Sequence, residues 1–162
     1  MSFGEKVTIV RPKSIRQTLK AKHELQERII KENKDMNIQK ELEAKVGKRS
    51  NIYLNNIEID PLMIKAIMIN EVVPSDALQD FYGAPDADYL KTTIPLFQGA
   101  GAEVKSIQDI LQMGIYITNA VKTPKTEYVI EKNSIEDSLP YLEAELSLFP
   151  NVNYFLQGHN AK

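Results

Sequence analysis

A short apolar segment that turns polar at its end constrains the fold of this chain more than any other feature. The segment 114–124 reads Gly-Ile-Tyr-Ile-Thr-Asn-Ala-Val-Lys-Thr-Pro. Gly114 can end a preceding helix, the apolar run after it is typical of a buried β-strand, and Pro124 stops further strand pairing. Asn119 therefore lies at the carboxyl end of a predicted strand, where open α/β sheets bind ligands. Its amide can donate and accept, so it can read a base edge, or it can simply satisfy loop backbone.

Further short runs place this strand in a sheet. Ile64–Ile69 is apolar, β-branched and bounded by polar residues, which predicts a buried central strand. The other predicted elements are a helix at 106–113, a helix at 133–148 that kinks or starts at Pro140, and a strand at 152–156. This alternation predicts right-handed crossovers and a three-layer α/β fold with a short, mostly parallel sheet. Because the sequence ends soon after the third strand, we expect an incomplete sheet that is truncated at that point.

The segments between these elements give weaker signals. Ile52–Ile59 carries Asn55-Asn56 between two apolar runs, which predicts a hairpin with a two-residue turn. The connection 75–93 is long and rich in Asp, and such loops are usually functional or mobile. Phe81 and Tyr82 lie inside it.

The first 50 residues are interpreted as a basic helical extension that precedes an α/β domain at 51–162. A capping-box pattern at Ser14 opens a predicted helix at 14–32, and a second helix is predicted at 37–46. The apolar stripe on these helices is thin, so we expect them to pack on the rest of the protein or on a second copy. Val7–Val10 is a candidate strand or a tail.

Charge is divided unevenly along the chain. Residues 11–50 hold 12 Lys and Arg against 6 Asp and Glu, whereas residues 51–162 hold 7 against 15. A basic helix can follow a phosphate backbone, although such a helix is more often a solvated face, and interleaved glutamates dilute the patch. The candidate DNA contacts in this extension are Lys20, Lys22, Arg28 and Lys31.

Composition excludes several classes of protein. The chain has no cysteine, which excludes disulfides, thiolate nucleophiles and iron–sulfur clusters. His23 and His159 have no metal-ligand spacing, so we predict no metal and no cofactor. No apolar run is long enough to span a bilayer, and the charged start is unlike a signal peptide, so we expect a cytoplasmic protein with no membrane partner.

Several segments match, in order, the motifs of one enzyme superfamily. Residues 68–74 (Met-Ile-Asn-Glu-Val-Val-Pro) are similar to a strand that enters a Gly-Glu-x-Pro-Gly turn. Residues 95–101 (Pro-Leu-Phe-Gln-Gly-Ala-Gly) are similar to a Pro-Phe-x-Gly-x-Ala-Gly segment, and 114–124 to a Tyr-Ile-Thr-Asn-x-Val-Lys-Cys segment. With the helix at 139–146 and the strand at 155–162, the stretch 64–162 resembles the uracil-DNA glycosylase superfamily, particularly its small bacterial-type members.

The resemblance implies base-excision repair, in which the N-glycosidic bond of a flipped uracil in DNA is hydrolysed. It implies that Phe97 stacks on the base, that Asn119 reads its edge, and that Glu71 positions or activates water. The glycines after Phe97, Gly99 and Gly101, would permit close backbone approach to the ligand. The resemblance also implies that Lys122 contacts DNA, and it offers Phe81 or Tyr82 as a second stacking candidate.

Three departures from the motifs bear on activity. Asn70 and Val73 replace a Gly and a Pro of the first motif, and Thr123 stands where cluster-binding members have a cysteine. The His-Pro-Ser-like loop, whose histidine stabilises charge on the leaving uracil, has no counterpart here, and His159 does not match it. We therefore expect weak or no activity. The alternative hypothesis is a non-catalytic nucleic-acid-binding or assembly module, which self-associates through the open sheet edge or the N-terminal helices.

Overall fold

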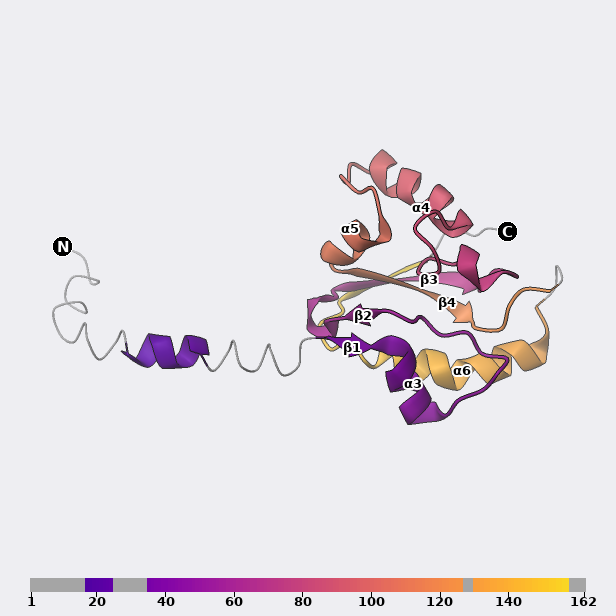
Figure 1. Cartoon of the computed structure of the whole chain (residues 1–162), viewed down its shortest axis with the longest axis horizontal. Coiled ribbons are helices and arrows are strands. Elements are labelled where there is room, and N and C mark those ends of the chain that lie inside the picture. Colours follow the sequence, from indigo (N-terminus) through magenta and orange to yellow (C-terminus); the bar gives the residue numbers. More distant parts are fainter. Residues whose placement is uncertain (1–16, 25–34, 127–129, 158–162) are drawn as a thin grey trace. The chain divides into compact units, whose positions relative to one another are not determined.

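The computed structural model describes residues 17–24, 35–126 and 130–157 (Figure 1). The chain divides into two compact units, Met1–Lys34 and Asp35–Lys162. In the first unit, residues 17–24 are helical and exposed, within the helix predicted at 14–32. Arg28, Lys31 and the candidate strand Val7–Val10 lie outside the described residues.

The second unit is built on a three-stranded parallel sheet, as the sequence predicts. β3 (Ala66–Val72) is central, and β4 (Ile115–Val121) and β5 (Tyr154–Gln157) flank it. Both neighbours run parallel to β3, and Ala66 pairs with Ile115 on one side and Tyr154 on the other. The strand order is β4-β3-β5, and buried residues of β3 belong to the cores on both faces of the sheet, as expected for a central parallel strand.

Helices cover both faces of this sheet, which makes three layers (Figure 1). α4 (Asp88–Gly99) and α5 (Ile107–Gln112) lie on one face, and α3 (Ile38–Val46) and α6 (Lys132–Leu146) lie on the other. Alternate side chains of each strand enter the two cores. Ile67 and Tyr116 belong to the core beneath α3 and α6, and Met68 and Ile117 belong to the core beneath α4 and α5.

Local chemistry sets the bounds of α5 and the start of β4. The Ser106 hydroxyl accepts from the Asp109 backbone N–H at 3.2 Å, which caps the helix predicted at 106–113. Gly114 then takes a φ of 86°, a left-handed conformation that L side chains rarely adopt. A Cβ on Gly114 would lie 3.0 Å from the Met63 carbonyl oxygen, so this glycine also allows two backbones to approach.

The hairpin predicted at 52–59 is wrong. β2 (Glu58–Ile59) pairs antiparallel with β1 (Met36–Asn37), and the other half of the expected hairpin is not a strand. Asn55 does not serve as a turn residue, because its side chain donates to the Tyr116 hydroxyl oxygen at 2.7 Å. The tertiary contact has overridden the local turn preference.

Helix α4 was not predicted, because Pro95 and Gly99 in its sequence usually interrupt helices. Its buried face carries Leu90 and Thr93 at helical spacing. The connection before α4 contains a short 3-10 helix, η2 (Ala77–Gln79). Helix α6, by contrast, runs through Pro140 and begins at Lys132, close to the predicted start.

The two outer strands are protected differently. Tyr82 covers part of the outer edge of β4, because its hydroxyl donates to the Ile117 carbonyl and accepts from the Ile117 N–H, both at 2.9 Å. No other described strand pairs with the outer edge of β5, and its Tyr154 and Phe155 side chains are 67% and 60% exposed. Self-association through this edge stays a prediction.

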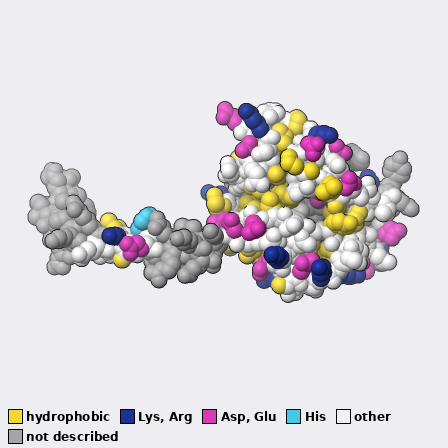
Figure 2. All heavy atoms as spheres, in the orientation of Figure 1, with side chains coloured by type: hydrophobic (Ala, Val, Ile, Leu, Met, Phe, Trp, Pro, Cys, Tyr) yellow, Lys and Arg dark blue, Asp and Glu magenta, His cyan; other side chains and the backbone are white. Residues whose placement is uncertain are grey.

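The surface of the second unit mixes apolar and charged side chains. In the view of Figure 2, hydrophobic side chains lie among charged ones over this unit. Of the helices in the described parts of the chain, none combines the length and apolar character needed to cross a bilayer.

Candidate functional site

The carboxyl ends of β3 and β4 form the switch point of the sheet. The chain leaves β3 towards α4 on one face and leaves β4 towards α6 on the other (Figure 1). Adjacent parallel strands whose connections diverge in this way open a crevice at their carboxyl ends, and ligands of open α/β sheets bind there.

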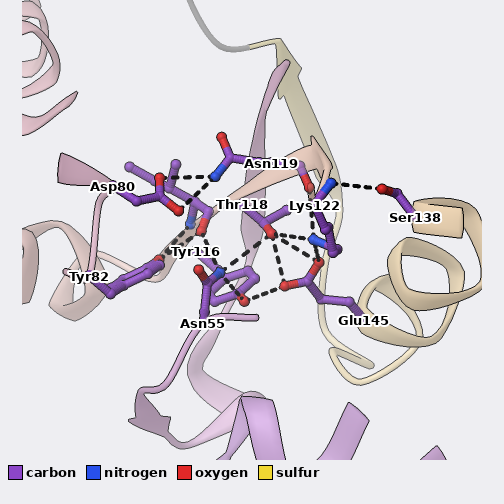
Figure 3. Close-up of polar contacts among 10 residues, drawn as sticks. Asn55, Asp80, Tyr82, Tyr116, Thr118, Asn119, Lys122, Ser138 and Glu145 are labelled. Atoms are coloured by element: carbon purple, nitrogen blue, oxygen red, sulfur yellow. Dashed lines mark hydrogen bonds and ion pairs between the residues drawn. The ribbon is translucent and has the colours of Figure 1, made fainter. Parts of the chain in front are cut away.

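Three polar side chains meet at these strand ends: Asn70, Asp80 and Asn119, here called the amide–carboxylate cluster. The Asn119 Nδ2 donates to both carboxylate oxygens of Asp80 at 2.9 Å. The Asn70 Nδ2 donates to the Asn119 Oδ1, also at 2.9 Å. All three side chains are buried, and Figure 3 shows Asn119 directed towards Asp80. A carboxylate only accepts when ionised, so Asp80 fixes which end of the Asn119 amide donates.

Asp80 is a buried carboxyl group with an altered titration. Burial raises its pKa above the ordinary 3.8, and the hydrogen bonds from Asn119 and from the Phe81 backbone N–H oppose that rise, as does the positive charge of Lys122. A perturbed carboxyl group at the ligand-binding end of a sheet is a candidate functional group.

Aromatic side chains pack beside the cluster. Phe81, which follows Asp80, is buried with its ring centre 5.2 Å from that of Tyr89. The Tyr89 hydroxyl donates to the Val72 carbonyl at the end of β3 at 2.8 Å. Tyr82 holds β4, and burial raises the pKa of its hydroxyl well above the usual range.

A second polar group, the ion-pair network, lies on the α6 face of β4. The Lys122 Nζ lies 2.6 Å from Glu145 Oε1, 2.7 Å from the Asn119 carbonyl oxygen and 3.1 Å from Thr118 Oγ1 (Figure 3). Glu145 also accepts from the hydroxyls of Thr118 and Tyr116. All three protons of the ammonium group have partners, so Lys122, predicted as a DNA contact, presents no exposed cation in this structure.

A pocket of about 300 Å³ opens at the same strand ends. Val72 and Val121, which are paired in register, form its floor. Its other lining residues are Asn51, from the loop after α3, and residues of the segment after β4 and of the start of α6, which include Thr123, Pro124, Ile130 and Ser134. Asn119 is not among the lining residues, so the pocket and the amide–carboxylate cluster are neighbouring features of one switch point.

The structure separates the residues that the resemblance groups together. Asn70 lies on the sheet face of Asn119, so Glu71 points to the opposite face and is exposed. Phe97 packs on the core beneath α4 and α5. The expected convergence of Glu71, Phe97 and Asn119 is therefore wrong for Glu71, because neighbouring residues of a strand face opposite ways.

Of the remaining predicted site residues, most lie away from the amide–carboxylate cluster. Gly99 and Gly101 are exposed, and a Cβ on either would meet nothing within 4 Å, so neither marks a close backbone approach here. Lys20 and Lys22 are exposed on the helix 17–24 of the first unit. Of the candidates for stacking on the base, Phe81 follows Asp80 in the chain, and Asp80 is the cluster residue that accepts from Asn119.

Sequence reasoning missed Asp80 and the pairing of Asn70 with Asn119. The pairing could have been found by aligning the polar ends of the two predicted strands, since Asn70 and Asn119 are in register. Asp80 had no signal, because it is one of several Asp residues in a long connection. Within the described residues, no group of three or more His, Asp or Glu side chains is placed to hold a metal ion.

No protein-family model matches this chain, and comparison with curated proteins and with solved structures finds no similar protein. The resemblance to uracil-DNA glycosylases thus rests on the sequence motifs alone.

Proposed function

We propose that this chain is a uracil-DNA glycosylase-like protein that binds a flipped uracil base at the carboxyl ends of β3 and β4. The observation that carries the proposal is the position of Asn119, whose oriented amide lies in the amide–carboxylate cluster at the switch point of a parallel sheet. An amide can donate to one carbonyl of uracil and accept from its ring N–H, which is a direct way to select this base.

The cluster gives each partner of Asn119 a role. Asp80 and Asn70 hold the two ends of the amide, so a base that reads Asn119 must replace one of these hydrogen bonds. The hydrogen bond from Asn119 to Asp80 is the one that a base would replace. Burial raises the pKa of Asp80, so its carboxylate takes up a proton and loses its negative charge more readily than an exposed carboxylate does. Asp80 also lies on the sheet face of Asn119, so in this proposal Asp80 replaces Glu71 as the carboxylate that positions water.

Base release by this chain should be weak or absent. Cleavage places negative charge on the leaving uracil, and a positioned donor for that charge is usually the largest catalytic contribution. The sequence has no His-Pro-Ser-like loop to supply one. We therefore expect recognition of uracil without rapid turnover.

The test compares single-stranded oligonucleotides that differ by one uracil or one cytosine. The wild type should bind the uracil strand more tightly, and Asn119→Ala should remove this preference while leaving the affinity for the cytosine strand unchanged. Asn153→Ala is the matched control, since Asn153 is exposed and its backbone N–H bonds to Lys65 at the other end of the sheet. A folded Asn119→Ala protein that keeps the preference would overturn the proposal.

The alternative, nucleic-acid binding without base recognition, is favoured by the first unit. Residues 1–34 hold 9 Lys and Arg against 4 Glu, and they form a unit separate from the sheet. Lys20 and Lys22 are exposed on its helix. This alternative predicts salt-dependent binding that Lys20→Ala and Lys22→Ala weaken for every base sequence, whereas Asn119→Ala leaves it unchanged.

A further inference from the structure

Lys122, three residues after Asn119, has a partner for each of its polar groups. Its backbone N–H donates to the Ser138 hydroxyl at 2.8 Å, and its carbonyl accepts from the Tyr53 N–H at 2.7 Å. Its side chain is 3% exposed, and the Nζ lies 2.6 Å from Glu145 and 2.7 Å from the Asn119 carbonyl oxygen. Lys122 is therefore held by α6 and by the loop before β2, and from there it contacts the backbone of Asn119.

The Asn119 carbonyl points away from β3, towards the outer edge of β4. Backbone groups of alternate strand residues point to opposite edges, so Asn119 points the same way as Ile117, whose N–H and carbonyl bond to the Tyr82 hydroxyl. No described strand lies on that edge to pair with β4. The Lys122 Nζ therefore supplies the bond to the Asn119 carbonyl that a neighbouring strand would otherwise make.

An ion pair is a costly way to join α6 to β4. Replacing a buried ion pair by apolar side chains of similar size is often neutral or stabilising, because interior charges lose their hydration. Glu145 also accepts from the hydroxyls of Thr118 and Tyr116. An apolar side chain at position 122 would still pack between α6 and β4, but it would leave the carbonyl of Asn119, a residue 2% exposed, without this donor. The buried ammonium group is therefore best explained by its bond to that carbonyl.

We infer that Lys122 is a positioning residue for Asn119, which holds the end of β4 so that the Asn119 amide meets the base in one fixed orientation. The inference rests on the proposed function, because it concerns the residue that reads uracil there. A side chain that is ordered before binding lowers the entropic cost of binding. This interior role replaces the DNA contact that the motif resemblance implies for Lys122.

The experiment measures, in the full-length protein, the ratio of the affinities for the uracil and cytosine strands. Lys122→Met/Glu145→Gln removes the donor to the Asn119 carbonyl without leaving an unpaired buried charge. Its preference for uracil should fall by about two- to tenfold, the usual cost of ordering one side chain on binding. Lys122→Met alone should show the same fall in preference.

Tyr116→Phe is the matched control for a purely structural role. It removes a hydroxyl that donates to Glu145 in the same network, and it leaves the bond from Lys122 to the Asn119 carbonyl in place. We expect its free energy of unfolding in urea to fall while its preference for uracil stays that of the wild type. A wild-type preference in Lys122→Met/Glu145→Gln would overturn the inference, and so would a preference that falls in step with stability in both variants.

The order of the Asn119 side chain is a second readout that needs no base. In the ligand-free protein, ¹⁵N relaxation should show a lower order parameter for the Asn119 Nδ2 group in Lys122→Met/Glu145→Gln, and the wild-type value in Tyr116→Phe. This measurement supports the positioning role only if the two variants differ in this way.

Asn119→Ala separates a failure of this inference from a failure of the proposed function. If Asn119→Ala removes the preference for uracil and Lys122→Met/Glu145→Gln keeps it, the proposed function stands and the role of Lys122 is refuted. If the wild type has no preference, the proposed function is refuted, and the order parameter of the Asn119 side chain decides the role of Lys122. An unchanged order parameter then refutes that role as well.

Discussion

The buried pair of Lys122 and Glu145 offers the sharpest test of how the site is held. The two side chains are 3% and 1% exposed, with 2.6 Å between Nζ and Oε1. Lys122→Met removes the ammonium group and leaves Glu145 as a buried carboxylate without its counter-ion. Breaking such a pair on one side costs about 3–5 kcal/mol, because an uncompensated charge is left in the interior.

The loss should be partly reversed when the second charge is also removed. In Lys122→Met/Glu145→Gln, the remaining amide oxygen can still accept from the hydroxyls of Thr118 and Tyr116, which now bond to the carboxylate. We therefore expect Glu145→Gln to stabilise the Lys122→Met protein, and the coupling free energy between the two substitutions to be about 0.5–3 kcal/mol, the usual size for residues in contact. The same change in the wild type should be destabilising, since it weakens an intact ion pair.

Urea unfolding followed by circular dichroism measures the four free energies of this cycle. Lys91→Met is the control, because it breaks a pair of similar length, 3.1 Å, in which both side chains are about two-thirds exposed. Its effect should be at most about 1 kcal/mol. If the double variant loses the full sum of the two single losses, the charges are not coupled, and the network does not hold β4 to α6 as described.

Three other perturbations test separate parts of the structure. The pKa of Asp80 in the folded state is raised above 3.8, so the folded state binds this proton more readily than the unfolded state does. The free energy of unfolding of the wild type, relative to that of Asp80→Asn, should therefore rise as the pH falls through the folded pKa and level off below pH 3.8. Urea unfolding at several pH values measures this difference, and a difference that does not change with pH would contradict the raised pKa of Asp80. Gly114→Ala should cost about 1–2 kcal/mol, because its φ of 86° disfavours a Cβ and the Met63 carbonyl is close; an unchanged melting temperature would refute this reasoning. Tyr82→Phe removes the hydroxyl that accepts from the Ile117 N–H, so hydrogen exchange at this N–H should become tenfold or more faster. A loss of about 1.4 kcal/mol of local protection corresponds to a factor of ten in exchange rate. An unaltered exchange rate would show that another group covers the outer edge of β4.

The pairing of β3 with β4 could be predicted because its signals are local. Two short apolar, β-branched runs that each end on an asparagine predict parallel neighbours with polar carboxyl ends, and Asn70 and Asn119 are indeed in register. The helix predicted at 37–46 is present as α3, which Asn37 caps by accepting from the Lys40 N–H at 3.0 Å, but it belongs to the second unit and not to the basic extension in which we expected it.

What the sequence could not show depends on contacts between distant residues. A shift of one position along β3 exchanges Asn70 for Glu71 on the face of Asn119, and a continuous apolar run does not reveal which face is which. Asn55 has a turn residue's chemistry, but it bonds to Tyr116, 61 residues away. Asp80 meets Asn119 across 39 residues.

The central claim is that Asn119 reads a uracil base, and its side-chain amide reports on this directly. In a ¹H–¹⁵N spectrum of the full-length protein, the Nδ2 resonances of Asn119 should shift in proportion to bound uracil, as the hydrogen bond to Asp80 is exchanged for one to the base. The Nδ2 resonances of Asn153, at the opposite end of the sheet, should not move. Uracil binding that leaves the Asn119 side-chain amide unshifted would contradict the account.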